Sequence, residues 1–203
     1  MSECPGGPGE VGKGEPSGDD LVAAFARWAA EERVNEAARQ RSRERWLRQQ
    51  AVEDATLAGI LTDLAERRMA VVATTRGSKV AGRLVGVAND FFVVEDRDRS
   101  GVLVVTEHVA SISRLTPTKW ADPSGDRPPP LSMRLVDALV MLAADRSPIR
   151  LGLTNGETVQ GDLVAVGRDV ITLRGHPQPG DRGRAHLRDL YVALGAIEVC
   201  APR

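Results

Sequence analysis

The chain repeats itself, and this internal duplication restricts the possible folds more than any other feature of the sequence. A shift of 79 residues places Gly77–Val94 on Gly156–Leu173 without a gap, and seven of the eighteen positions are identical. The preceding helical segments also match if one extra residue is allowed near Ser147. The matched leucines are Leu57, Leu61 and Leu64 with Leu135, Leu139 and Leu142. Because the same order extends over a helix, a turn and two strands, we interpret the match as a duplicated module.

The shared positions predict local structure. Asn155-Gly156 is typical of a two-residue hairpin turn, in which both central residues adopt positive φ. Gly82 and Gly161 fall inside predicted strands, where glycine usually marks a bend. Asp90 and Asp169 follow turn residues, so we expect their side chains to bond nearby backbone amides rather than to act in catalysis.

The periodicity predicts five successive segments. Residues 1–18 are rich in Gly, Pro, Glu and Ser, which predicts a disordered tail. Residues 19–50 are predicted as an N-terminal helix, and residues 51–115 as a helix followed by five strands. Residues 116–130 form a Pro-rich linker, and residues 131–203 repeat the helix-and-strand unit. In the second unit, Ser132 is the expected N-cap and residues 185–187 the expected start of the fourth strand.

A helix followed by five short strands, with Gly77, Val80, Gly82, Leu84 and Val87 ahead of a turn and an Asp, resembles the Sm-like small β-barrel. This group includes bacterial Sm-like RNA chaperones and the C-terminal domain of the ribosome maturation factor. The resemblance implies an α+β chain with two small Sm-like or SH3-like β-barrels, each preceded by a helix, plus an N-terminal helical extension.

The chain departs from the RNA-binding members of that group. They place an Asn shortly after the Asp turn, where this chain has Phe91–Val94 and Val170–Leu173. Their second signature, an Ile or Val followed by Arg-Gly, is not recognisable in residues 103–108 or 187–190. We therefore carry over the fold and not the RNA pocket.

Composition and motifs argue against several classes of function. The formal net charge is −1, so no global field draws the chain to nucleic acid or to an anionic membrane. Two cysteines, Cys4 and Cys200, are no disulfide framework and suit a reducing cytoplasm. We find no signal pattern and no membrane span. The histidines His108, His176 and His186 lack partners at zinc-site spacing, and phosphate-loop and dinucleotide motifs are missing. We expect no enzyme, metal, cofactor or small-molecule substrate.

Two basic groups are candidates for contact with nucleic acid. The residues are Arg39, Arg41, Arg43, Arg45, Trp46 and Arg48 in the N-terminal helix, and Arg174, Arg182, Arg184 and Arg188 in a loop region of the second copy. Arginines beside a tryptophan suit a phosphate backbone and a stacked base. The alternative, which we favour, is a solvated helix whose arginines pair with Glu36, Glu44 and Glu53.

An apolar stripe of Leu21, Phe25 and Trp28 recurs at helical spacing near the start of the same helix. It either packs on the rest of the chain or forms a face for a partner helix. Together these features predict a non-catalytic cytoplasmic adaptor or scaffold that binds protein partners or itself. The alternative is an RNA-associated protein that uses the two arginine groups.

Overall fold

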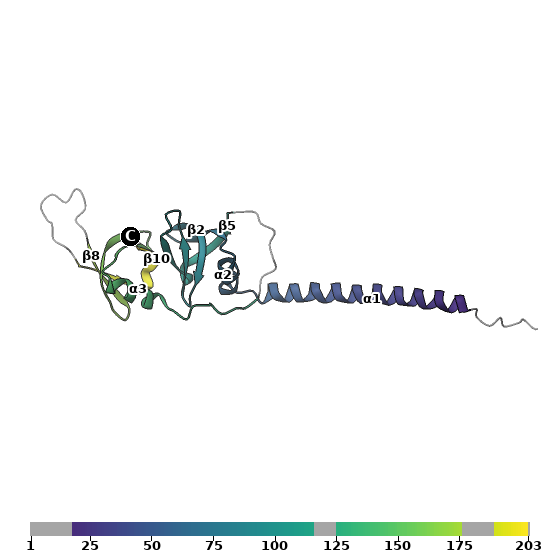
Figure 1. Cartoon of the computed structure of the whole chain (residues 1–203). Coiled ribbons are helices and arrows are strands. Elements are labelled where there is room, and N and C mark those ends of the chain that lie inside the picture. The colour runs from purple at the N-terminus through teal and green to yellow at the C-terminus, as the bar shows by residue number, and fades with distance from the viewer. Residues whose placement is uncertain (1–17, 116–124, 176–188, 203) are drawn as a thin grey trace, which may run out of the picture. The chain divides into compact units, whose positions relative to one another are not determined.

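A computed structural model describes residues 18–115, 125–175 and 189–202 of the chain (Figure 1). Outside these ranges lie residues 1–17 of the predicted tail, most of the linker, the strand start at 185–187 and three of the candidate arginines. The chain divides into two compact units, residues 1–49 and 50–203.

The first unit contains most of helix α1 (Gly18–Glu53). Its described side chains from Leu21 onward are almost all exposed, because Arg, Glu and Gln occupy most faces of the helix. Among the residues that the structure describes, no helix is both long enough and apolar enough to cross a membrane.

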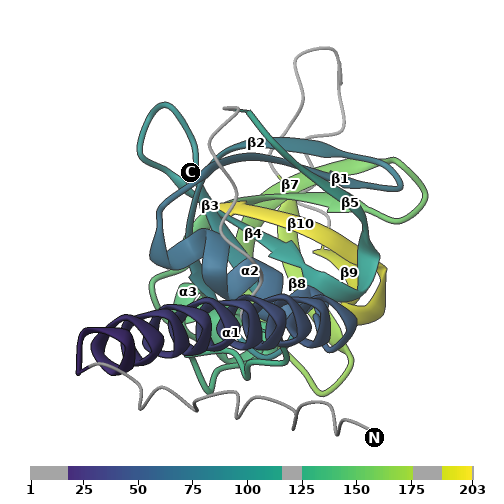
Figure 2. The ribbon, with the colours of Figure 1, turned by 90° about the vertical axis from the view of Figure 1, so that its right-hand side faces the viewer.

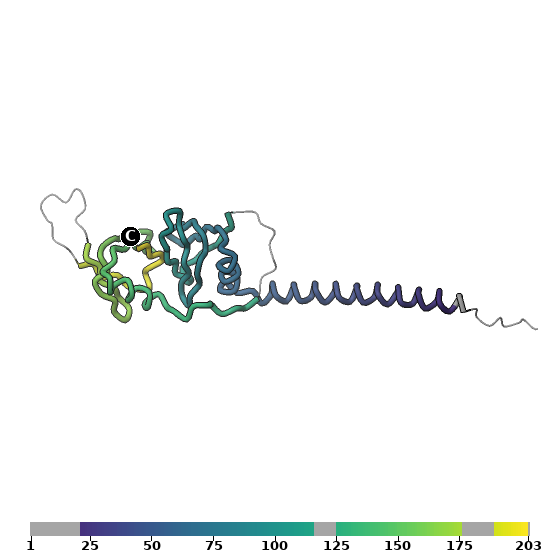
Figure 3. Tube along the Cα trace, viewed as in Figure 1, coloured from purple at the N-terminus to yellow at the C-terminus, as the bar shows by residue number. Residues whose placement is uncertain are grey.

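The second unit contains two halves with the same order of elements, visible in Figure 3 as successive stretches of the chain. The first half contains α2 (Leu57–Glu66), β1 (Ala70–Thr75), β2 (Lys79–Val87), β3 (Phe91–Glu95), β4 (Gly101–Val105), η1 (Thr106–His108) and β5 (Val109–Arg114). The second half contains α3 (Leu135–Ala144), β6 (Pro148–Leu153), β7 (Thr158–Val166), β8 (Val170–Gly175), β9 (Asp189–Ala193), η2 (Leu194–Ala196) and β10 (Ile197–Pro202).

The duplication extends to the register of every strand pair. Val71 pairs with Gly82 and Ile149 with Gly161, so β1–β2 and β6–β7 have the same alignment. The pairs β1–β5 and β6–β10 share their register and an irregularity at the same place. The same holds for β2–β3 with β7–β8, and for β3–β4 with β8–β9. A β5 residue therefore has a definite equivalent in β10, and a β4 residue has one in β9.

The expectation of two small β-barrels is wrong. The strands form one antiparallel open sheet of ten strands, in the order β5-β1-β2-β3-β4-β10-β6-β7-β8-β9. To close the first half on itself, β4 would have to pair with β5; instead β4 pairs with β10 of the second half, and β5 ends the sheet. The sheet is curved, as Figure 2 shows, and the two halves are joined by continuous backbone pairing.

Two hydrophobic clusters fill this curved sheet, one in each half. Helix α2 packs against β2 and contributes Leu61 and Leu64 to the first cluster. Helix α3 packs against β7 and contributes Leu135 and Leu139 to the second. The repeat aligns these leucines with one another, so the apolar stripe of each helix packs against the sheet in both halves.

Three local predictions need correction. The N-cap of α3 is Arg134, with a reciprocal bond from its backbone N–H to Asp137, and not Ser132. The extra residue of the second half lies in the β6–β7 turn and not near Ser147, since β1 and β6 keep one alignment up to that turn. That turn is a three-residue loop, because the backbone N–H of Leu153 donates to the carbonyl oxygen of Glu157. Within the loop only Gly156 has positive φ, of 84°.

Candidate interaction surfaces

The seam between the halves, where β4 meets β10, shows how this sheet recognises another strand. Val104 lies opposite Val199, and Leu103 opposite Cys200. Leu103 belongs to the hydrophobic cluster of the second half, whereas Val199 belongs to that of the first. Each half thus inserts side chains into the core of the other, and four consecutive β4 residues are buried as a result.

A buried carboxyl group holds the seam at the β1–β2 turn. Glu198 of β10 is 0% exposed, and its Oε2 accepts hydrogen bonds from Thr75 Oγ1 at 2.8 Å and from Gly77 N at 3.0 Å. Its Oε1 has no partner among the described residues. By the register, Ala110 occupies the equivalent place in β5, and Leu153 the place of Thr75. The carboxyl group is therefore specific to the internal seam.

A second polar contact between the two halves involves Asp90, which lies away from the β4–β10 seam. Its Oδ1 accepts a hydrogen bond of 2.7 Å from the backbone N–H of Leu135, the first residue of α3. The prediction that Asp90 bonds nearby amides is wrong, because its partner is distant in sequence and belongs to the other half. An anionic group at this position also favours the positive end of the helix dipole. Asp169, the equivalent of Asp90, is exposed and has no hydrogen-bonded side chain among the described residues.

The two ends of the sheet are β5 and β9, the equivalents of β10 and β4. In the described chain no strand pairs with their outer edges. Most of their side chains are exposed, whereas most of those of β4 and β10 are buried. Tyr191 is 70% exposed and Leu190 is 40% exposed, whereas their β4 equivalents Leu103 and Val102 are each 8% exposed. These strands form the two outer edges of the sheet, and we call them the β5 edge and the β9 edge.

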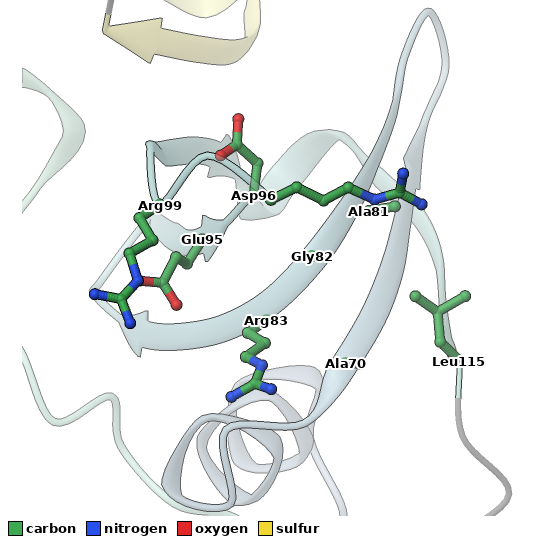
Figure 4. Close-up of a pocket in the computed structure, with 9 residues that line it drawn as sticks. Ala70, Ala81, Gly82, Arg83, Glu95, Asp96, Arg99 and Leu115 are labelled. Carbon is green, nitrogen blue, oxygen red and sulfur yellow. The ribbon is translucent and has the colours of Figure 1, made fainter.

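A surface depression of about 410 Å³ lies in the first half, where residues of β1, β2 and the β3–β4 loop line it (Figure 4). Its charged lining is mixed: Arg83, Arg97 and Arg99 with Glu95 and Asp96. Asp96 accepts hydrogen bonds from the amides of residues 98 and 100, which orders the loop between β3 and β4. The sheet backbone is close-packed here, since a Cβ on Gly82 would collide with the carbonyl oxygen of Glu95.

A second depression of about 290 Å³ lies on the seam, where Val102 and Val199 line it together with residues of β2, β6 and β7. Lys79 and Arg150 give it a basic lining. No group of three His, Cys, Asp or Glu residues in the described ranges is placed to hold a metal ion. Burial raises the pKa of the Cys200 thiol to about 12, so this cysteine is suited to packing and not to nucleophilic chemistry.

The predicted arginine helix is present in α1, with its arginines and Trp46 all exposed. Arg39 lies 3.8 Å from carboxylate oxygens of both Glu32 and Glu36, and Arg41 donates to the carbonyl of Ala37 at 3.1 Å. Some of the positive charge is therefore balanced within the helix. These ion pairs are strongly exposed, and such pairs contribute little to stability.

The remaining predicted residues separate into two groups. Arg174, at the end of β8, lies 3.7 Å from Asp189 of β9, so it forms a cross-strand ion pair. Arg182, Arg184 and Arg188 lie outside the described residues. Leu21, Phe25 and Trp28 share an exposed face of α1, and the rings of Phe25 and Trp28 are 5.7 Å apart.

Sequence reasoning missed Tyr191, Leu190 and Glu198, although signals for all three existed. Glu198 is a lone acidic residue in an apolar run, which suggests a buried polar contact. Residues 102–105 form an uninterrupted apolar run, which is typical of a strand covered on both faces, whereas β9 begins with an aspartate. That difference between two equivalent strands indicates which of them has a neighbour.

Comparison with known protein families finds no matching family, and a comparison with curated proteins finds no match either. The resemblance to Sm-like proteins therefore stays a prediction.

Proposed function

We propose that this chain is a non-catalytic cytoplasmic scaffold that binds protein through the outer edges of its sheet. The observation that carries the proposal is the pair of sheet ends, β5 and β9, which have no strand partner among the described residues. Tyr191 and Leu190 add exposed apolar surface to the β9 edge.

Strand edges are strong binding elements because each presents a row of backbone N–H and C=O groups that need partners. An extended segment that adds to such an edge gains main-chain hydrogen bonds, and side-chain pockets then provide specificity. Natural proteins usually protect exposed edges with charges, bulges or Pro. At the β9 edge, by contrast, an aromatic residue lies beside a leucine, which is typical of a contact surface.

The mixed charges of the 410 Å³ depression support the non-catalytic part of the proposal. Its three arginines and two acidic residues offer no nucleophile with an adjacent base. Nε2 of His108, which follows β4, lies 3.2 Å from the carbonyl oxygen of Gly195 in the second half. This histidine therefore makes a structural contact between the halves.

The proposal is tested by two measurements on the full chain. Sedimentation velocity over roughly a hundredfold range of concentration reports self-association. Fluorescence anisotropy with a labelled peptide of residues 197–202, the β10 sequence, reports strand addition, and a scrambled peptide is the control. We expect association, peptide binding or both, and weaker signals in Tyr191→Lys. If the wild-type chain shows neither self-association nor peptide binding, the proposal is refuted.

RNA association is a second candidate, which the exposure of every arginine from Arg39 to Arg48 on α1 favours. Binding of mixed single-stranded RNA measured at low and at doubled salt tests it, because phosphate contacts release counterions and weaken steeply with salt. No binding at low salt would refute it. The exposed face of Leu21, Phe25 and Trp28 is a further candidate for protein contact through a partner helix.

A further inference from the structure

Helix α1 exposes three aromatic side chains on one of its sides. Phe25, Trp28 and Trp46 are 68%, 59% and 62% exposed. Because the helix has about 3.6 residues per turn, Trp46 lies five whole turns after Trp28 and points in the same direction, and Phe25 points about 60° away. Helices in proteins gain most of their stability from packing of an apolar face. The side that these aromatic groups share therefore needs a partner.

Charged residues occupy the same side of α1 between the aromatic groups, and they separate by sign. Glu32 and Glu36 come first, and Arg39 and Arg43 follow. Their spacing of three or four residues keeps all four beside the aromatic groups. From its N-terminal end this side therefore reads aromatic, acidic, basic, aromatic. We call it the α1 face and define it by Phe25, Trp28, Glu32, Glu36, Arg39, Arg43 and Trp46.

We propose that the α1 face pairs with the α1 face of a second copy in antiparallel orientation. The pairing goes beyond the proposed function, because it uses the first compact unit and not the edges of the sheet. The order of the face is complementary to itself when one copy is reversed, since acidic residues then meet basic ones and aromatic groups meet aromatic groups. The charges therefore select a second copy of this chain as the partner.

The centre of the face sets the register. Pairing centred between Asn35 and Glu36 brings the acidic part of each copy level with the basic part of the other. A twofold axis relates the two helices, so each contact occurs twice. The paired levels, with the residue of the second copy named last, are Phe25 with Trp46, Trp28 with Arg43, and Glu32 with Arg39.

The groups at each level attract one another. A guanidinium over a tryptophan ring makes a cation–π contact, which suits Trp28 and Arg43. Glu32 and Arg39 carry opposite charges, and within one helix they already lie 3.8 Å apart, so both side chains follow the α1 face. The rings of the Phe25 level add apolar burial and aromatic contact. Apolar burial thus stabilises the pair, and the charged levels select its direction.

A parallel pairing in register fails on charge. It would bring Glu32 against Glu32, Arg39 against Arg39, and Arg43 against Arg43. Like charges at contact positions suppress a pairing, whereas opposite charges fix partner choice and direction. The antiparallel pair is also closed, because both copies use the same face. Association through α1 therefore stops at two chains.

Charge reversal in the full chain tests the pairing, with sedimentation velocity as the readout. Glu32→Arg alone or Arg39→Glu alone puts like charges at both central levels, so we expect each to weaken association by at least about tenfold. A mixture of the two variants restores opposite charges at both levels and should associate like the wild type. Loss of helix in either variant would not be rescued by mixing, and circular dichroism checks the helix content.

Arg41→Glu is the matched control for Arg39→Glu. Arg41 is exposed and lies about 200° around the helix from Arg39, on the side away from the α1 face. We expect it to leave association unchanged. If both arginine variants weaken association equally and nuclease abolishes it, RNA holds the chains together and the pairing is wrong.

Disulfide trapping tests the direction of the pairing. Full-length chains carry Cys4→Ser and either Leu21→Cys or Gln50→Cys, and Cys200 stays because it is buried. These two positions lie level in the antiparallel pair but about 40 Å apart along the helix axis in a parallel pair. In a glutathione buffer, the mixed disulfide should exceed either self-disulfide by at least about fivefold, since only the antiparallel pair brings the two positions together.

The outcomes separate this contact from the sheet edges. Rescue by mixing in a Tyr191→Lys background supports the pairing independently of the β9 edge. A wild-type chain that stays monomeric, or self-disulfides that exceed the mixed one, overturns it. Association that Tyr191→Lys abolishes and Glu32→Arg leaves unchanged also overturns it, but leaves the proposed function standing.

Discussion

Replacing Glu198 with alanine tests whether the internal seam depends on its buried carboxyl group. The substitution removes the acceptor for Gly77 N and one of two acceptors for Thr75 Oγ1, which also lies 3.2 Å from the carbonyl oxygen of Ser78. A hydrogen bond contributes about 0.5–1.5 kcal/mol net, and a buried donor left without a partner costs about 1–3 kcal/mol. Part of this loss is offset, because Oε1 is buried without a partner and its removal relieves a desolvation cost. We expect a net loss of about 2 kcal/mol in the free energy of unfolding.

The assay is urea denaturation of the full chain, monitored by far-ultraviolet circular dichroism, with thermal melting as a check. A loss of about 2 kcal/mol lowers the Tm by about 4–8 °C in a unit of this size. Glu157→Ala is the matched control, since Glu157 is exposed in the neighbouring β6–β7 turn and its loss should cost less than about 0.5 kcal/mol. Glu198→Gln keeps one oxygen acceptor and should fall between the two. A Glu198→Ala chain as stable as Glu157→Ala would refute the reasoning.

Three further predictions concern individual contacts. The hydrogen bond from Arg127 lowers the pKa of Glu66 below 4.5, so Arg127→Met should raise it in an NMR titration. Because the pKa of Glu66 is lower in the folded chain than in the unfolded chain, the Arg127–Glu66 contact stabilises the fold at pH values above the unfolded pKa. This stabilisation is lost as the pH falls through the folded pKa. Burial raises the pKa of Cys200 from 9.0 to about 12, so a thiol reagent at pH 8 should label Cys200 only after unfolding. Because the thiol loses its proton more easily in the unfolded chain, the free energy of unfolding should decline as pH rises from 9 toward 12. Asp90→Ala should cost about 1 kcal/mol through the lost cap of α3, whereas the equivalent Asp169→Ala should leave the dilute chain unchanged in urea melts.

The elements were predictable because their signals are local. The apolar spacing of Leu57, Leu61 and Leu64 predicts an amphipathic helix, and α2 buries two of these leucines against β2. Alternation and turn residues predict a helix followed by strands in residues 51–115 and again in 131–203, and the helices and strands of the two halves lie in these ranges. The cap of α3 escaped prediction because Arg134 is not a typical N-cap residue, and here Asp137 and Asp90 supply the acceptors.

The candidate site was less predictable, because it is defined by what lies next to each strand. Tyr191 and Leu103 occupy equivalent places in two copies of one strand, yet one is exposed and the other buried. The residue itself does not specify that difference. It follows from the presence of β10 beside β4 and from the lack of a described strand beside β9.

By itself, the sequence of this chain determined the duplication, the order of helices and strands, and the apolar stripe of each helix that faces a core. Periodicity encodes these properties, and it acts over a few neighbouring residues. Only the tertiary structure decided that β4 pairs with β10, so that one open sheet replaces two barrels. The physical reason is that backbone hydrogen bonds are nearly the same for any strand partner. The choice of partner depends on the fit of Leu103, Val199 and Glu198 across the seam, and these residues meet only in the folded chain.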